Sequence, residues 1–200
     1  MSPRPYNLGK RREVIDQGRQ QMLDAARSLL AGTDGYAAFT VDAVARQADV
    51  ARATVYYQFG SKAGLLEAVC DHLADLGGLA DLAGAFTEPD PHRALHRFIG
   101  CFGQFWAADR AATRRLRALA VLDPDVGAVI AARDQRRRDG LAVLAGRLPG
   151  PPADQDHLVR VLTALTSFEL FDALAGPDQD LTAAIPDVLG LVKASVDHRG

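Results

Sequence analysis

Between Phe39 and Lys62 the chain gathers side chains whose chemistry suits the reading of DNA. Arginine can bond guanine through two hydrogen bonds, glutamine can bond adenine in the same way, and a threonine methyl group can pack on a thymine methyl group. Tyrosine hydroxyls can reach the phosphates. The candidate DNA-contacting residues are Thr40, Arg46, Arg52, Thr54, Tyr56, Tyr57, Gln58 and Lys62.

The spacing of apolar residues places most of these candidates on the outer face of a short helix. Two apolar segments meet across residues 48–50, and this short connection predicts a helix-turn-helix. In the second segment Val55 and Phe59 share a buried face, so Thr54 and Tyr57 lie on the opposite side. A plain three-helix bundle with surface tyrosines is the structural alternative. An aromatic, amide, hydroxyl and guanidinium surface on one short helix favours DNA contact.

The run FTVDAVARQADVARATVYYQFGSKAGLLEAV resembles the N-terminal DNA-binding domain of the TetR family of bacterial transcriptional regulators. The resembling features are Phe-Thr-Val at the start of the second helix, an aromatic recognition helix ending in Gln-Phe, and Ser-Lys before a long helix. The resemblance covers about a quarter of the chain, from about Met22 to Asp71. It implies DNA contact by Thr40, by Lys62 and by the polar residues of the recognition helix.

Two positions depart from the family pattern. The turn has Asp49 where the family usually has glycine, and the recognition helix follows Ala51 instead of serine or threonine. Aspartate tolerates the left-handed backbone better than most residues, so the turn is expected to form. A missing hydroxyl cap costs about 1 kcal/mol and removes a phosphate contact, so we expect lower DNA affinity with the fold preserved.

Charge is unevenly distributed along the chain. Residues 1–62 hold nine Lys or Arg against six Asp or Glu, whereas residues 63–200 hold fourteen against nineteen. The net charge of −2 excludes a strongly basic, non-specific nucleic-acid binder. No stretch approaches the roughly 18 apolar residues of a membrane span, and the first residues lack the apolar core of a signal peptide. We therefore expect no membrane partner and a cytoplasmic location.

Helical spacing of apolar residues through the whole chain predicts an all-α fold of about nine helices. We divide it into a flexible basic arm (1–12), a three-helix helix-turn-helix DNA-binding domain (13–62) and a helical ligand-binding and dimerisation domain (63–200). The arm either lays arginines into a minor groove or is a solvated tail. Gly77–Pro91 is a linker candidate. One helix is predicted over residues 158–174 and another over 181–196.

Aromatic residues concentrate in the predicted helix that follows Asp90 and Pro91. They either form core or line an effector pocket, and two carboxylates in a later apolar helix either bond a cationic effector or satisfy neighbouring polar groups. The ligand-pocket candidates are Phe98, Phe102, Phe105, Trp106, Phe168, Glu169 and Asp172.

Other chemistry is weakly indicated. His92 and His96 have a metal-clamping spacing but no third ligand nearby in sequence, so we predict no metal site and no cofactor. The arginines over residues 110–138 could form a second DNA site, but a solvated face or ion pairs with Asp134 and Asp139 are favoured. No phosphate loop, nucleophile elbow or metalloprotease motif occurs, so an enzyme is not expected.

The resemblance implies a homodimer that forms through the last two helices and binds a palindromic double-stranded operator. A small-molecule effector, whose chemistry the sequence leaves open, would release a repressor of this kind from its operator. The alternative is a helical ligand-binding or protein-interaction module that retains a helix-turn-helix without operator-specific regulation.

Overall fold

The computed structural model describes residues 8–32, 39–151 and 154–197, with side chains from Ile15 onward, and every regular element in these ranges is a helix. The predicted all-α class is confirmed. Contacts divide the chain into two units, Met1–Val69 and Cys70–Gly200. The three-part division made from the sequence stays a prediction. Its basic arm falls on residues 1–7, which lie outside the described ranges, and on the start of the first helix.

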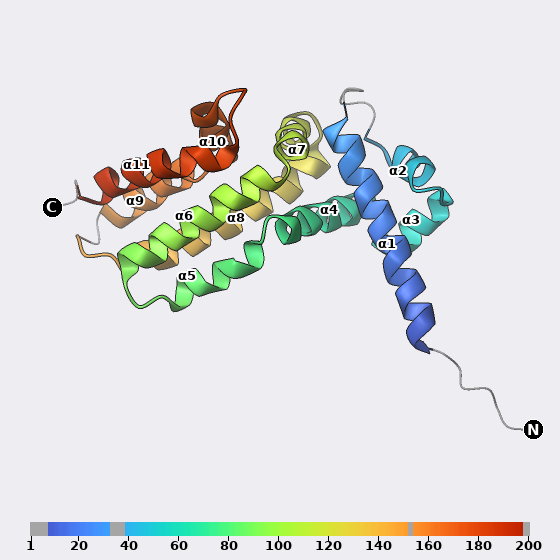
Figure 1. Ribbon diagram of the computed structural model, residues 1–200, viewed down its shortest axis with the longest axis horizontal. Helices are drawn as coiled ribbons and strands as arrows, with labels where there is room; N and C mark the ends of the chain where they lie inside the picture. Colours follow the sequence, from blue (N-terminus) through green and yellow to red (C-terminus); the bar gives the residue numbers. More distant parts are fainter. Residues whose placement is uncertain (1–7, 33–38, 152–153, 198–200) are drawn as a thin grey trace, which may run out of the picture. The chain divides into compact units, whose positions relative to one another are not determined.

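The first unit contains α1 (Leu8–Ala31), α2 (Val41–Gln47), α3 (Arg52–Phe59) and the beginning of α4 (Lys62–Leu76) (Figure 1). α1 starts at Leu8, within the stretch 1–12 that the sequence assigned to a flexible arm. Met22, Ala26 and Leu30, spaced by one helical turn, are buried on one side of α1, and α2 packs against both α1 and α3.

Side-chain caps fix the helix starts in this unit. The Thr40 hydroxyl accepts a hydrogen bond from the Ala43 amide at 3.1 Å and caps α2. The Ser61 hydroxyl accepts one from the Gly64 amide at 3.0 Å and caps α4. Gly60, with φ of 74°, ends α3 in a conformation that favours glycine. The chain direction is thus set on both sides of α3.

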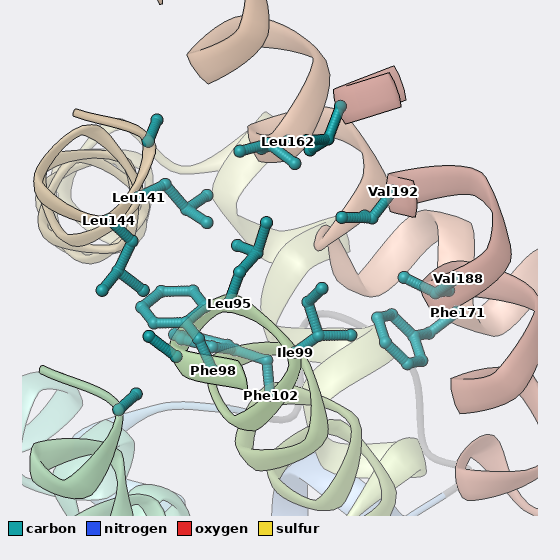
Figure 2. Packing of buried hydrophobic residues seen from close by; sticks show 14 of the residues in the cluster. Leu95, Phe98, Ile99, Phe102, Leu141, Leu144, Leu162, Phe171, Val188 and Val192 are labelled. Atoms are coloured by element: carbon teal, nitrogen blue, oxygen red, sulfur yellow. The ribbon is translucent and has the colours of Figure 1, made fainter. Parts of the chain in front are cut away.

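The second unit is a helical bundle built around α6. Its elements are the end of α4, η2 (Leu79–Leu82), α5 (Ala83–Thr87), α6 (Pro91–Ala108), α7 (Arg110–Leu122), α8 (Pro124–Ala145), α9 (Gln155–Leu165), α10 (Phe168–Ala175), η4 (Leu181–Ala184) and α11 (Ile185–Asp197). α6 packs against α8 and α11, and α8 packs against α7 and α9. Figure 2 shows Phe98 on the side of α6 that faces Leu144 of α8, and Ile99 on the side that faces Phe171 and Val188.

Two sequence predictions about this unit were wrong. The linker candidate Gly77–Pro91 contains η2 and α5, because Ala85 is fully buried and Leu79 and Leu82 pack on the core. The helix predicted over 158–174 is two helices, because the Thr166 and Ser167 hydroxyls bond back to carbonyls of α9 and the Ser167 hydroxyl also caps α10. The described residues therefore form eleven α-helices instead of about nine.

Within the described ranges, no helix combines the length and apolar character needed to cross a bilayer.

Candidate nucleic-acid interface and effector cavity

α3 has one buried face and one wet face. Val55 and Phe59 are 1% and 9% exposed, whereas Tyr57 is 86% exposed on the opposite side. Arg52 and Tyr56 are also exposed, and Thr54 and Gln58 are half-buried at the edges. The two-sided helix expected from the apolar spacing is therefore present. The outer face offers hydroxyl, amide and guanidinium groups, which are the groups that contact base edges and phosphates.

The turn between α2 and α3 sets the angle at which α3 leaves α2. Asp49 has φ of 52°, which is the left-handed conformation, at the position where the family pattern usually has glycine. The Val50 amide donates to the Ala45 carbonyl at 2.9 Å, so the last carbonyls of α2 are satisfied as the chain turns. Ala51 makes no side-chain cap, as its residue type requires. The first amides of α3, those of Arg52 and Ala53, therefore receive no side-chain cap from Ala51.

Arg52 is held on the outer face of α3 by local contacts. Its guanidinium lies 3.2 Å from the Asp42 carboxylate, donates to the Tyr56 hydroxyl at 3.3 Å and stacks 5.5 Å from the Tyr56 ring centroid. The hydrogen bond to Tyr56 and the charge of Asp42 raise the pKa of Arg52. Because the pair is exposed, it is weak, and Arg52 can exchange Asp42 for a phosphate or a base at little cost.

Arg19 of α1 positions the end of α3, and the sequence analysis did not identify it. Its guanidinium donates to the Gln58 carbonyl at 3.2 Å and stacks 4.6 Å from the Phe59 ring centroid. A cation on a C-terminal carbonyl also suits the helix dipole. The signal was present, because Arg19 lies one turn before Met22 on the face of α1 that is buried.

The remaining DNA candidates lie on the neighbouring helices. Thr40 and Arg46, at the two ends of α2, are exposed, and Lys62 is half-buried at the first residue of α4. The structure places Tyr56, Tyr57 and Arg52 together on one face of one helix. DNA contact by all eight candidates stays a prediction.

The second unit contains a cavity of about 220 Å³. Its apolar wall comes from the C-terminal part of α4 and from η2, α5 and α6, and includes Leu73 and Phe86. Its polar residues come from α7 and α8, and four of them are the arginines Arg117, Arg133, Arg136 and Arg137. A mostly apolar cavity with a few converging polar groups is the usual form of a small-molecule site.

The predicted pocket residues divide between the cavity and its surroundings. Phe98, Phe102, Phe105 and Trp106 line the cavity, with centroids of neighbouring rings 4.5–6.1 Å apart along α6. Phe168 lies outside the lining and packs edge-on against Trp106 at 5.8 Å. Large rings that pack on one another hold the cavity wall rigid.

The two carboxylate candidates satisfy neighbouring arginines and do not line the cavity. Asp172 lies 2.6 Å from both Arg110 and Arg114, and Glu169 accepts a hydrogen bond from Arg117. Burial alone would raise the pKa of Asp172, but the hydrogen bonds from the two arginines lower it. Of the two roles left open by the sequence, the structure places these carboxylates in ion pairs between α7 and α10.

Arg137 is a buried charged residue of the cavity lining that was not among the pocket candidates from the sequence. It is 6% exposed, and it donates to the Thr163 carbonyl at 2.7 Å and to the Thr166 hydroxyl at 2.6 Å. Burial lowers its pKa. The sequence assigned the arginines of this region to a solvated face or to ion pairs with Asp134 and Asp139. Arg137 does pair with Asp134, at 3.4 Å, but its side chain is buried, four residues before buried Leu141. Helical spacing alone would have put it inside.

Among the described residues no three His, Cys, Asp or Glu side chains gather as metal ligands.

Comparison with known proteins bears on the first unit most directly. The family model described as bacterial regulatory proteins, tetR family, matches residues 22–69. The HTH-type transcriptional regulator AlkX of Mycobacterium tuberculosis is 36% identical over 93 residues, which are 46% of this chain and 43% of AlkX. EthR of Mycolicibacterium smegmatis is 34% identical over 107 residues, 50% of this chain and 48% of EthR. The matches span somewhat less than half the length of these relatives.

Solved structures match almost the whole fold. A TetR-like regulator from Rhodococcus sp. RHA1 has a TM-score of 0.63 at 24% identity and covers 90% of this chain and 96% of its own. A regulator from Saccharomonospora viridis, solved in complex with choline, has a TM-score of 0.62 at 18% identity and covers 92% and 97%. These likenesses show the fold.

AlkX and EthR are both named as transcriptional regulators, which is the class of protein expected from the sequence. The matched segment is the one whose Phe-Thr-Val start, aromatic recognition helix and Ser-Lys cap were identified from the sequence. Residues 22–69 therefore match the DNA-binding domain of the TetR family of bacterial regulatory proteins, and the two relatives named as transcriptional regulators are similar over about half of the chain.

Proposed function

We propose that this chain is a DNA-binding transcriptional regulator that reads a double-stranded operator with α3. The single observation that carries the proposal is the exposure of Tyr57, 86%, opposite Val55, 1%, on the same short helix. A ring turned fully to water gives the folded unit no burial energy, so its presence is better explained by contact with a partner. A major groove is wide enough for this one helix.

The proposal includes control by a small molecule held in the cavity. α4 supplies Leu73 and Ala74 to the cavity wall, and the same helix begins at Lys62, one of the DNA candidates. A ligand that fits only one position of α4 would shift the population of DNA-binding states, by no more than its difference in affinity for those states. The choline complex of the Saccharomonospora viridis regulator supports small-molecule binding by this fold. We expect the bound ligand to release the regulator from its operator, so that the protein acts as a repressor in the cytoplasm.

The proposed regulator acts as a homodimer paired through its C-terminal helices. The two helices predicted to pair correspond to α9, α10 and α11 in the structure. Leu174 and Leu191, at the end of α10 and in α11, are 40% and 43% exposed. Two-fold symmetry would place two copies of α3 about 34–36 Å apart, one turn of DNA, and predicts a palindromic operator. Sedimentation of the chain in solution tests this part, since a monomer would contradict it.

A binding assay over a salt range tests the function. Fluorescence anisotropy with a pool of palindromic duplexes, followed by sequencing of the bound fraction, should select one sequence, and the logarithm of its affinity should fall linearly with the logarithm of salt concentration. Selection of no sequence, or equal affinity for all duplexes, would favour the alternative of a ligand-binding or interaction module that retains the helix-turn-helix.

A further inference from the structure

The charged side chains that line the cavity of the second unit indicate which class of ligand it prefers. Four arginines line it, and Asp134 is the one carboxylate among the described lining residues. Two of these arginines also pair with carboxylates outside the lining, Arg117 with Glu169 and Arg133 with Asp71 at 2.7 Å. Among the described residues Arg137 pairs only with Asp134, at 3.4 Å, and shares it with Arg117, which lies 2.9 Å from the same carboxylate. Where water is excluded, an incompletely compensated guanidinium attracts an anion strongly.

Arg137 brings this positive charge inside the protein. Its side chain is 5% exposed, and its Nε is a buried donor without a hydrogen-bond acceptor among the described residues. Its other nitrogens are used by the Thr163 carbonyl, the Thr166 hydroxyl and Asp134. Because a buried unsatisfied donor is costly, a ligand oxygen that accepts from Nε would gain both the hydrogen bond and the charge.

The rest of the lining favours an apolar chain. Phe98, Phe102 and Leu73 lie on the wall, and the volume of about 220 Å³ is below the roughly 300–1,000 Å³ of pockets for drug-sized ligands. The site therefore suits a small molecule with one polar end.

A cationic ligand is disfavoured by the same residues. An aromatic cavity can hold a quaternary ammonium group against its ring faces. Here guanidinium groups already lie over those rings, with Arg117 5.8 Å from the Trp106 ring centroid and Arg137 5.9 Å from the Phe102 ring centroid. A bound ammonium ion would meet these like charges at close range.

We infer that the cavity binds a small apolar carboxylate, with its chain against the α4 and α6 residues and its carboxylate on Arg137. This inference rests on the proposed function for its regulatory meaning, but binding itself is independent of DNA. The Nε of Arg137 donates to one carboxylate oxygen, and the ligand's negative charge adds to the partial compensation that Arg137 receives from the shared Asp134.

Isothermal titration of the full chain at neutral pH tests the inference with four probes: octanoate, octan-1-ol, octylammonium and choline. Octanoate should bind at least tenfold more tightly than octan-1-ol, and the two cations should give no measurable binding. The preference follows from charge, since the three eight-carbon probes share one chain. Equal binding of octanoate and octan-1-ol, or preference for either cation, would overturn the inference.

Variants at one position identify the recognition group. Arg137→Gln should weaken octanoate binding about ten- to a hundredfold, as loss of a charge-assisted hydrogen bond does, with less than a threefold change for octan-1-ol. Arg138→Gln is the matched control, because Arg138 is the next residue of α8, is exposed and does not line the cavity. An equal effect of the two variants on octanoate would remove Arg137 from the site.

Arg137 also bonds α9, so Arg137→Gln could unfold the unit. Arg137→Lys keeps the charge and the reach to Thr163 but removes Nε, and it should retain the preference for octanoate over octylammonium at reduced affinity. Loss of that preference in a folded Arg137→Lys protein would contradict the assignment. Operator binding without octanoate selectivity would overturn this inference alone, whereas octanoate selectivity without operator binding would overturn the proposed regulator and leave the inference standing.

Discussion

Tyr57→Ala and Val55→Ala form a matched pair on α3 that separates DNA contact from folding. Tyr57 is 86% exposed, so removal of its ring changes almost no burial, and the free energy of unfolding should stay within about 0.5 kcal/mol of the wild-type value. Val55 is 1% exposed, and its truncation should cost about 1–3 kcal/mol through lost transfer energy and the cavity left behind. Urea unfolding followed by circular dichroism measures both values.

Operator affinity should respond in the opposite order. Loss of one direct contact to DNA costs about 1–3 kcal/mol, and a dimer loses the contact twice, so Tyr57→Ala should weaken binding by about 2–6 kcal/mol. This corresponds to roughly thirtyfold at the lower limit and ten-thousandfold or more at the upper limit. Val55→Ala, assayed where it is folded, should bind the operator nearly as wild type does. Fluorescence anisotropy with the selected duplex gives both affinities.

The reasoning would be refuted by either of two results. If Tyr57→Ala destabilised the protein as much as Val55→Ala, the ring would be part of the core and its exposure would have no bearing on DNA. If Tyr57→Ala were stable and bound the operator unchanged, α3 would not present this face to the bases. Helicity and sedimentation of each variant are the controls that exclude unfolding and dissociation as the cause of lost binding.

Three further changes test the packing that supports these sites. Asp49→Ala should lower stability by about 1 kcal/mol because alanine tolerates the left-handed conformation poorly, whereas Asp49→Gly should not, as urea unfolding would reveal. Gly103→Ala should lower the free energy of unfolding by about 1–3 kcal/mol because the added Cβ would lie 2.5 Å from Ile185. Gly100→Ala on the same helix meets nothing within 4 Å and should stabilise the protein by about 0.5–1 kcal/mol. Equal shifts of the thermal unfolding midpoint in the two variants would contradict this reasoning. Asp172→Asn should cost about 1 kcal/mol near neutral pH. In the folded protein the pKa of Asp172 is lowered below 3.8. The difference in stability between Asp172→Asn and wild type should therefore persist above pH 3.8 and vanish as the pH falls below the folded pKa. Unfolding midpoints that differ equally at pH 7 and pH 2 would exclude the ion pairs as the source of this difference.

Local signals made the first unit predictable from the sequence. The Thr40 cap, the buried Val55 and Phe59, and the turn at Asp49 each depend on residues a few positions apart, and all are present. Arg19 was missed because its acceptor, the Gln58 carbonyl, is 39 residues away. A pattern read along one helix does not show which backbone group of another helix will need a donor.

The helix break at Thr166 was unpredictable for a different reason. Apolar residues keep their helical spacing through Leu162, Leu165 and Phe168, so a periodic pattern continues where the helix does not. The break is made by hydrogen bonds, in which the Thr166 hydroxyl donates to the Leu162 carbonyl at 2.8 Å and the Ser167 amide donates to the Ala164 carbonyl. Serine and threonine hydroxyls compete with the backbone hydrogen bonds of a helix in this way, but their presence in the sequence does not show at which residue the helix ends.

This break also explains how a guanidinium came to be buried beside an aromatic cavity. In a continuous helix the Thr163 carbonyl would accept from the Ser167 amide, whereas here it accepts from Arg137 at 2.7 Å. The Thr166 carbonyl likewise accepts from the Trp106 indole at 3.1 Å. Carbonyls released at a helix end carry partial negative charge and can offset the cost of burying a cation. The end of α9 and the burial of Arg137 are thus one structural feature, because the carbonyl freed at the helix end accepts from the guanidinium.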